Sequence, residues 1–363
     1  MKLRARIGIL AAAVLALAAA LVLLLPRPTD AFALESLVSD TGPTATHDPG
    51  LVNGWGLAAS ETGPWWTTSE AGGVSPLYAA DGRKQALTVQ VEGGPTGVVY
   101  NGGGGFLVHG GGRTGTARFI YACEDGSIRG WAPTVPQGWS ETAVVAVSGA
   151  DTGAIFRGLA LARLPDGAQR LYATDFHNDK VLVYDSAWRP VATPGGFVDA
   201  AMPAWFAPFG IQAIGNRVFV TYAGRAPVNG NDAPTGGYVD EFDLQGRLIA
   251  RVGSMGELHE PWGVARAPQG FGRFAGDILV ANFGTGRITA FRRHGDGWSF
   301  DGHLPGRNGK PLVVQGIWGM AFGRGGMSGP KDTLFFAAGP HGWRGDTETS
   351  VHGLFGSISR IRS

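Results

Sequence analysis

Short apolar runs alternate with glycine-rich polar segments along most of the chain. The runs combine β-branched and aromatic residues, as in Arg170–Phe176 and Asp277–Phe283. Runs of this kind, bounded by Gly, Pro, Asn and Asp, are typical of β-strands joined by tight turns. We therefore expect an all-β protein with very little helix.

A small-residue motif centred on a glycine stands before each group of runs. That glycine occurs six times, at intervals of 41, 61, 52, 53 and 56 residues: Gly56, Gly97, Gly158, Gly210, Gly263 and Gly319. Self-similarity at this period is typical of β-propellers, whose four-stranded blades take roughly 40 to 50 residues each. We interpret the glycines as packing positions on the innermost strands, where backbones come close together. The aromatic residue before four of them either wedges between blades, which we favour, or lines the channel mouth: Trp55, Phe209, Trp262 and Trp318.

The last repeat lacks an outer strand, because the chain stops directly after "SISRI". The apolar segment Leu34–Ser39, ahead of the first repeat, can supply that strand and leave no open seam. The sequence therefore predicts a single domain over residues 34–363. We expect a six-bladed β-propeller of four-stranded antiparallel blades, in which the N-terminal strand completes the last blade.

The first 33 residues have a different character. Three basic residues within the first six positions precede nineteen uncharged residues (7–25), and the small-x-small sequence "AFA" follows at 31–33. This order predicts an export signal over residues 1–33, and nineteen apolar residues also suffice for an uncleaved membrane anchor. Cleavage and anchoring both stay open. We expect a periplasmic, secreted or membrane-anchored protein that touches the membrane only through this segment, if it is uncleaved.

Charge and cysteine content exclude little. Thirty basic and twenty-nine acidic residues give a net charge of +1, so no electrostatic footprint for nucleic acid is present. Cys123 is the single cysteine, so no intramolecular disulfide can form. We expect a monomer that is stabilised by packing.

The segment "LYATDFHNDKVLVYD", Leu171–Asp185, resembles the NHL-repeat consensus: a strand ending in Asp, a turn with Asn, a basic residue and another strand. Degraded copies recur through all six repeats. Residues from Leu37 to Ile361 also look like an uncharacterised bacterial family of exported proteins, in blocks such as "HGLFGSISRI", although that family's C-terminal sorting tail is missing. The resemblance implies a propeller fold and export, and it implies no established reaction.

Two sets of polar residues should meet over the axis at one face of the propeller. From the turns after the second strands come Ser69, Glu70, Glu124, Asp175, His177, Tyr222, Asn282, His341 and His352. From the segments leading into the inner strands come Asn53, Arg157, His259 and Glu260.

Asp175 and His177 form the most specific pair in these sets. Residues two apart on an extended segment share a face, so this carboxylate and imidazole can bind one divalent cation or act as acid and base. An Asp at this position also commonly caps its own turn, and both interpretations stay open for Asp175. As metal ligands, for calcium or zinc, we nominate Glu124, Asp175 and Asn282, an arrangement that loosely resembles calcium-dependent propeller lactonases. As ligand-binding residues we nominate Arg157, Tyr222, Glu260 and His352.

Two functions from different classes fit these residues. The first is an exported binding module that holds a small molecule, glycan or peptide at the channel mouth. The second is a metal-dependent hydrolase or lyase, with Asp175 and His177 as the catalytic pair and a divalent cation that activates water. We prefer the binding module, because no motif demands catalysis and the residues lack a tight metal-ligand spacing.

Overall fold

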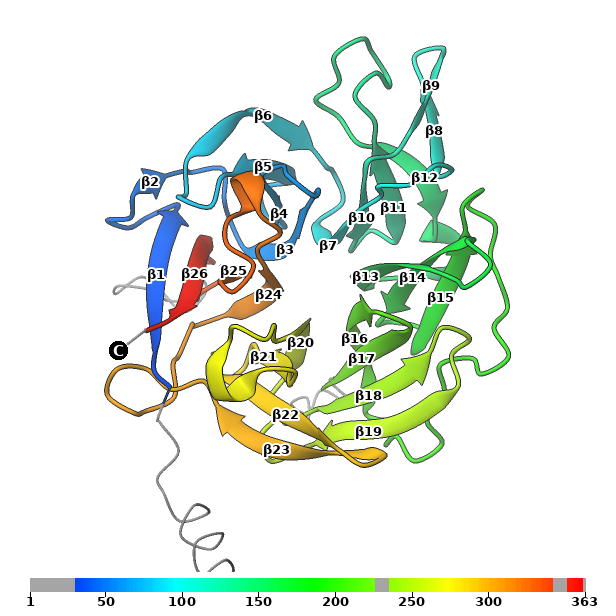
Figure 1. The fold of residues 1–363 in the computed structure, drawn as a ribbon. Coiled ribbons are helices and arrows are strands. Elements are labelled where there is room, and N and C mark those ends of the chain that lie inside the picture. Colours follow the sequence, from blue (N-terminus) through cyan, green and yellow to red (C-terminus); the bar gives the residue numbers. More distant parts are fainter. Residues whose placement is uncertain (1–29, 226–234, 342–350, 362–363) are drawn as a thin grey trace, which may run out of the picture.

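The computed structural model describes residues 30–225, 235–341 and 351–361, which form a ring of six β-sheets around a central axis (Figure 1). The predicted all-β propeller fold is confirmed. Within the described ranges, the helices are three 3₁₀ turns: η1 (Ala150–Thr152), η2 (Gly272–Phe274) and η3 (Gly326–Ser328). None of the helices in these ranges is long and apolar enough to cross a membrane, and the apolar segment 7–25 lies outside them.

Blades 1 to 5 run outward from the axis in chain order. Blade 1 contains β3 (Gly54–Ala59), β4 (Trp65–Ser69), β5 (Val74–Tyr78) and β6 (Lys84–Gln90). Blade 2 contains β7 (Pro95–Tyr100), β10 (Phe119–Cys123), β11 (Ser127–Trp131) and β12 (Val144–Ser148), with an inserted hairpin of β8 (Leu107–Gly110) and β9 (Arg113–Thr116). Blade 3 contains β13 (Phe156–Arg163), β14 (Gln169–Asp175) and β15 (Lys180–Asp185).

The remaining three blades complete the ring. Blade 4 contains β16 (Phe206–Ile214), β17 (Arg217–Gly224), β18 (Tyr238–Asp243) and β19 (Leu248–Ser254). Blade 5 contains β20 (Pro261–Arg266), β21 (Ile278–Asn282), β22 (Ile288–His294) and β23 (Gly297–His303). Blade 6 contains β24 (Ile317–Phe322), β25 (Leu334–Ala338), β26 (Leu354–Arg360), β1 (Phe32–Ser39) and the short β2 (Thr46–His47).

Blade 3 departs from the four-stranded pattern. Its fourth run makes only an isolated bridge between Tyr184 and Pro190. Pro190 and Pro194 lie in this run, and proline cannot donate to a strand ladder. Blade 3 therefore ends at three strands.

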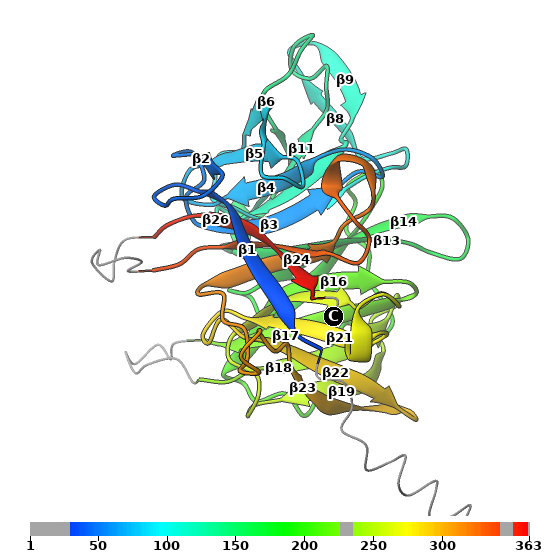
Figure 2. The same cartoon turned by 60° about the vertical axis from the view of Figure 1, so that its left-hand side comes forward.

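The N-terminal strand closes the ring as predicted. β1 pairs antiparallel with β26, from Phe32 opposite Arg360 to Ser39 opposite Leu354, and the two strands lie side by side in both views (Figures 1 and 2). The closure begins before Leu34. The Asp30 carboxylate accepts a hydrogen bond from Arg360 Nε at 2.7 Å and another from the backbone N–H of Arg273.

The six repeat glycines pack as predicted. A Cβ atom added to Gly210 would lie 2.1 Å from the carbonyl oxygen of Trp262, and one on Gly263 would lie 2.4 Å from that of Trp318. Gly319 meets the carbonyl oxygen of Trp55 in the same way, at 2.6 Å, across the closing seam. Each of these glycines thus lets a blade touch the backbone of the next one at the axis.

Candidate functional site

Two rings of side chains surround the axis at the end of the channel where the inner strands begin. The inner-strand ring consists of the residue before each repeat glycine: Trp55, Thr96, Arg157, Phe209, Trp262 and Trp318. The turn ring consists of the equivalent residue where each second strand gives way to its turn: Glu70, Glu124, Phe176, Ala223, Phe283 and Gly339.

The aromatic members of the two rings pack against one another across the axis. Trp318 stacks on Trp55 and on Phe283, with ring centroids 4.0 Å apart in each pair, and it meets Phe209 at 5.6 Å and Trp262 at 6.2 Å. Trp55, Trp262 and Phe283 belong to the two blades that flank Trp318, whereas Phe209 lies two blades away. These residues therefore pack between neighbouring blades, as predicted, and also meet over the mouth of the channel. They form an aromatic plug. Behind it, the glycine-lined channel narrows to a cavity of about 30 Å³.

Blades 1 to 3 carry a charged cluster beside the plug. Arg157 pairs with Glu124, and its guanidinium lies 5.3 Å from the ring centroid of Trp55. The carboxyl of Glu124 also contacts that of Glu70, which accepts a hydrogen bond from Asn53 Nδ2 at 2.7 Å. Burial and the Glu70 charge raise the pKa of Glu124, against the opposing effect of Arg157. Glu124 therefore lies between a guanidinium and a second carboxyl on a half-buried surface.

Two N–H donors in this cluster lack an acceptor. Trp55 Nε1 and Arg157 Nε are both buried and have no hydrogen-bond partner among the described residues. Buried donors are nearly always satisfied by protein, water or ligand. An oxygen atom from outside the protein would satisfy them.

Asp175 and Asn282 point away from the charged cluster and bind the backbone instead. The Asp175 carboxylate accepts hydrogen bonds from the backbone N–H groups of Ile155 and Asn178 and from Asn178 Nδ2. Asn282 Oδ1 likewise accepts from the backbone N–H of His259. Both residues precede the turn ring by one position, and adjacent strand residues point to opposite faces. Asp175 thus has the capping geometry that the sequence left open.

The predicted metal ligands are therefore not brought together. Glu124 belongs to the turn ring, whereas Asp175 and Asn282 hold the segments that lead into the inner strands. Across the described ranges, no three His, Cys, Asp or Glu side chains are placed so that they could hold one metal ion. The residues do not fit the divalent-cation site, so we derive no step through a metal.

The other nominated residues scatter. Exposed His177 lies beside Gly153, while its neighbour Phe176 turns to the axis and meets Phe209 at 5.3 Å. Tyr222 packs in the core cluster that joins blades 3 and 4. The Tyr222 pKa is raised well above its usual value by burial and by nearby carboxylates. His352 contacts the Asp40 carboxylate through Nδ1 at 2.9 Å.

Glu260 holds in blade 5 the position that Asn53 holds in blade 1. Its backbone has φ of 50°, close to the 52° of Asn53, and both residues stand three positions before a repeat glycine. A carboxylate at positive φ is uncommon and marks a position where function is worth testing. Burial raises the pKa of Glu260, which makes no ion pair within the part of the chain that the structure describes.

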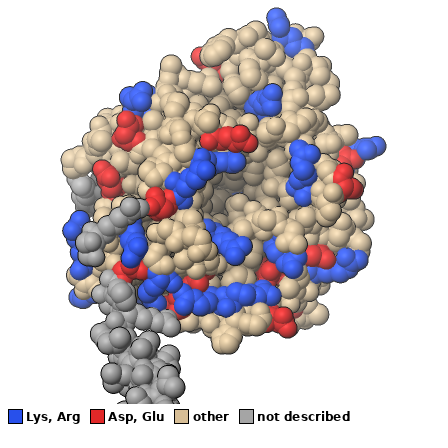
Figure 3. Space-filling model, viewed as in Figure 1, with Lys and Arg blue, Asp and Glu red and all other residues tan. Residues whose placement is uncertain are grey.

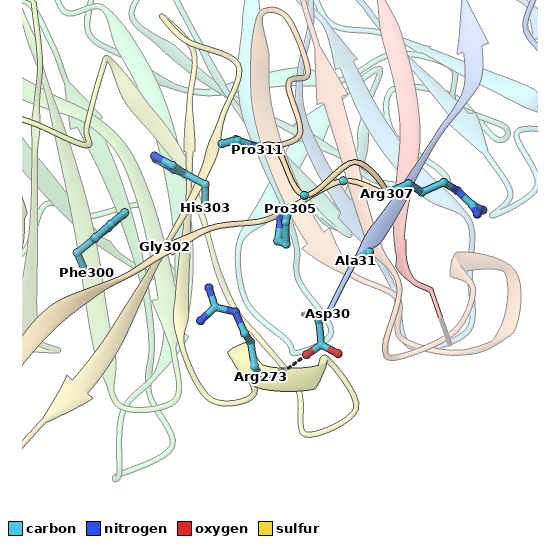
Figure 4. A pocket seen from close by; sticks show the side chains of 11 residues that line it. Asp30, Ala31, Arg273, Phe300, Gly302, His303, Pro305, Arg307 and Pro311 are labelled. Atoms are coloured by element: carbon cyan, nitrogen blue, oxygen red, sulfur yellow. Dashed lines mark hydrogen bonds between the residues drawn. The ribbon is translucent and has the colours of Figure 1, made fainter. Parts of the chain in front are cut away.

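A cavity of about 510 Å³ lies away from this site, at the outer edge of blades 5 and 6 (Figure 4). Asp30, Arg273 and His303 contribute side chains to its wall. These groups already have partners, since Asp30 binds Arg360 and His303 Nε2 contacts Glu257 at 3.0 Å. Burial lowers the pKa of His303. The cavity therefore offers few free polar groups.

Solved structures place the chain in the β-propeller class. It matches a protein of unknown function from Bacteroides thetaiotaomicron with a TM-score of 0.56 and 10% identity, over 91% of this chain and 76% of that one. It matches the PQQ-bound aldose sugar dehydrogenase of Streptomyces coelicolor with a TM-score of 0.52 and 15% identity, over 92% and 100%. At these identities the likeness shows the fold alone.

Sequence relatives define the family. The chain is 30% identical over 355 residues to "Uncharacterized protein R648" of Acanthamoeba polyphaga mimivirus, covering 92% of this chain and 82% of the relative. It is 29% identical over 312 residues to "Uncharacterized protein L690" of the same virus, covering 81% and 80%. The chain belongs to the family of these viral proteins. No family model matches it, and the NHL-like and bacterial assignments stay predictions.

Proposed function

We propose that the protein is a binding module that takes a small polyhydroxylated ligand, such as a sugar, at the mouth where the inner strands begin. The supporting geometry is two-sided. Blades 1 to 3 supply Glu70, Glu124 and Arg157, and blades 4 to 6 supply mainly aromatic rings. Carbohydrate hydroxyls both donate and accept hydrogen bonds, while the C–H faces of a sugar pack on aromatic rings.

The unpaired donors carry this proposal. Trp55 Nε1 and Arg157 Nε need acceptors, and the carboxylates of Glu70 and Glu124, which already have partners in Asn53 and Arg157, can accept further hydrogen bonds. A hydroxyl group can accept from the first two and donate to a carboxylate in one place. A purely apolar ligand would leave the two buried N–H groups unsatisfied, which costs roughly 1 to 3 kcal/mol for each.

Tryptophan fluorescence of the full-length protein tests this proposal, because the plug contains three Trp side chains. We expect a saturable change with at least one member of a panel of hexoses, amino sugars and uronic acids. The variants Arg157→Gln and Glu124→Gln should weaken that response roughly tenfold or more. The matched control is Arg247→Gln, which removes an exposed ion pair with Asp243 in blade 4. No response to any sugar, or an equal response in the variants, would contradict the proposal.

The same cluster supports an acid–base enzyme as a second candidate. The raised pKa of Glu124 favours its protonated form, and the carboxyl of Glu70, which accepts a hydrogen bond from Asn53, lies in contact with it. This arrangement replaces the metal-dependent hydrolase or lyase predicted from Asp175 and His177. Turnover of a bound ligand that is lost in both Glu70→Gln and Glu124→Gln would support it, and binding without turnover would exclude it.

We also propose that the protein works outside the cytoplasm and that its leader is not cut after Ala33. A cut there would remove Phe32, whose ring packs 4.6 Å from that of Phe271, together with Asp30 and its ion pair. A reporter fused behind the propeller should be active only outside the cytoplasm, and intact mass should show a chain that retains Asp30. A mature chain beginning at Leu34 would contradict the second point.

A further inference from the structure

The other end of the channel opens into a cavity of about 430 Å³. It is surrounded by the ends of the inner strands β3, β7, β13, β16, β20 and β24. The space-filling view shows this face hollowed at its centre, with Lys and Arg side chains around the hollow and acidic groups beside those at its upper and left edges (Figure 3). Cavities of roughly 300 to 1,000 Å³ are the usual size for small-molecule sites.

The charges that line this cavity have one sign. Arg266 and Arg324 contribute to its wall, and no Asp or Glu does. Arg324 Nη1 donates to the carbonyl oxygen of Ala59 at 3.2 Å, which holds that side chain at the rim. The exposed side chain of Arg266 makes no hydrogen bond or ion pair with any residue that the structure describes. An anion placed here would therefore compete with no carboxylate of the cavity wall.

The remaining side chains of the wall are mostly apolar, with Gln212 and Tyr100 as the polar ones, and the exposed surface as a whole is somewhat more polar than apolar. Its apolar side chains include Leu57, Val98, Leu161, Val264, Met320 and Phe322. Gln212 also borders the narrow channel beneath and therefore marks the floor of the cavity. The wall can cover an apolar body while the rim binds a charged group.

We infer that this mouth binds a small amphipathic organic anion, with a carboxylate or sulfonate between Arg266 and Arg324 and an apolar body against the inner-strand ends. A guanidinium binds such groups through paired N–H donors, which fixes their orientation. The site is separated from the aromatic plug by the glycine-lined channel. It therefore stands or fails independently of the sugar site.

The test uses 8-anilinonaphthalene-1-sulfonate, an aromatic anion whose fluorescence rises on apolar burial, with the full-length protein. We expect saturable binding of one equivalent. Arg266→Gln should weaken binding of this anion roughly tenfold. The uncharged analogue N-phenyl-1-naphthylamine should bind the parent protein and this variant with equal affinity. Arg266 is the better first variant, because its side chain is exposed and makes no hydrogen bond or ion pair among the described residues.

Two further variants locate the site. Gln212→Trp would fill the floor of the cavity and should abolish binding, whereas Arg157→Gln, at the other mouth, should leave it unchanged. Arg247→Gln in the outer hairpin of blade 4 controls for the general loss of a positive charge. Equal affinity in the parent, Arg266→Gln and Gln212→Trp would overturn the inference, as would equal weakening in Arg247→Gln.

Discussion

The two ends of the central channel differ although the same six strands build both. Where the inner strands begin, Trp and Phe side chains fill the axis and acidic groups gather beside them. Where those strands end, the axis is hollow and the lining charges are arginines. A ring of glycines separates the two. The repeat thus specifies the packing between the ends and leaves each end to residues that differ from blade to blade.

The largest expected effect on stability comes from removing a side chain of the aromatic plug, at the end of the channel where the inner strands begin. Trp318 contacts four other aromatic rings, so Trp318→Ala should cost about 3–5 kcal/mol of the free energy of unfolding. Chemical denaturation measures this loss. Trp139→Ala is the control, because Trp139 is 72% exposed and its loss should change stability little. Equal stability of the two variants would show that the plug does not support the ring.

The next effect comes from the glycine ring between the two ends. Gly210→Ala forces a methyl group against the carbonyl oxygen of Trp262, and overpacking of this kind costs about 1–3 kcal/mol or more. We expect a lower melting temperature by calorimetry. Gly104→Ala is the matched control, since an added Cβ there meets nothing within 4 Å. A normal melting temperature for Gly210→Ala would contradict the close approach of blades 4 and 5.

A pair of arginine variants compares the electrostatics of the two mouths. Arg157→Gln strands half-buried Glu124 beside Glu70 and should cost about 1–2 kcal/mol. Arg266→Gln removes a side chain without a partner among the described residues and should stay within about 0.5 kcal/mol of the parent. Urea denaturation of both variants measures the difference. Equal costs would mean that Arg157 is not held by its carboxylates.

The smallest effect is the pH dependence of stability. Burial raises the pKa values of Glu124 and Glu260 at the closed end, and those of Asp240 and Asp277 to about 6 in the blades. The folded state then binds more protons than the unfolded state between about pH 4 and 6, so stability should rise as the pH falls through this window.

Thermal melts between pH 7 and 4 check this rise. Below it, stability should fall again, because the lowered pKa of Asp48 means that its stabilising contacts are lost on protonation. Asp240→Asn should flatten the rise, since it removes one of the groups responsible. A melting temperature that falls steadily from pH 7 downward would contradict this set of pKa shifts.

The fold was predictable from the sequence because packing repeats. Each of the six glycines lies against the backbone of a neighbouring blade, where a larger residue would clash. The same residue therefore recurs once in each blade, and its recurrence gives the number of blades. The closing strand was predictable because the last sheet lacked an edge partner. The irregular fourth run of blade 3 also had a signal, in the prolines of "RPVATP".

The site was predicted only in part, because of a shift of one residue. Glu124 was grouped with Asp175 and Asn282 as the acidic end of each second strand, whereas its true counterparts are Phe176 and Phe283. A shift of one residue along a strand points the side chain to the opposite face of the sheet. The sequence alone does not fix the pairing register of the strands, so it does not reveal such a shift. The open mouth has no repeated motif, since only its position at the strand ends unites its residues. No signal in the sequence could have found it.

The pairing of β1 with β26 orders events during synthesis. Phe32 is among the first described residues to leave the ribosome, and its partner Arg360 is among the last. At roughly 5–20 residues per second, the first strand waits on the order of 20 to 70 seconds for the strand it must join. During this interval the nascent chain can form individual blades but no closed ring. A translocation channel or chaperone therefore meets a chain whose ends are not yet joined.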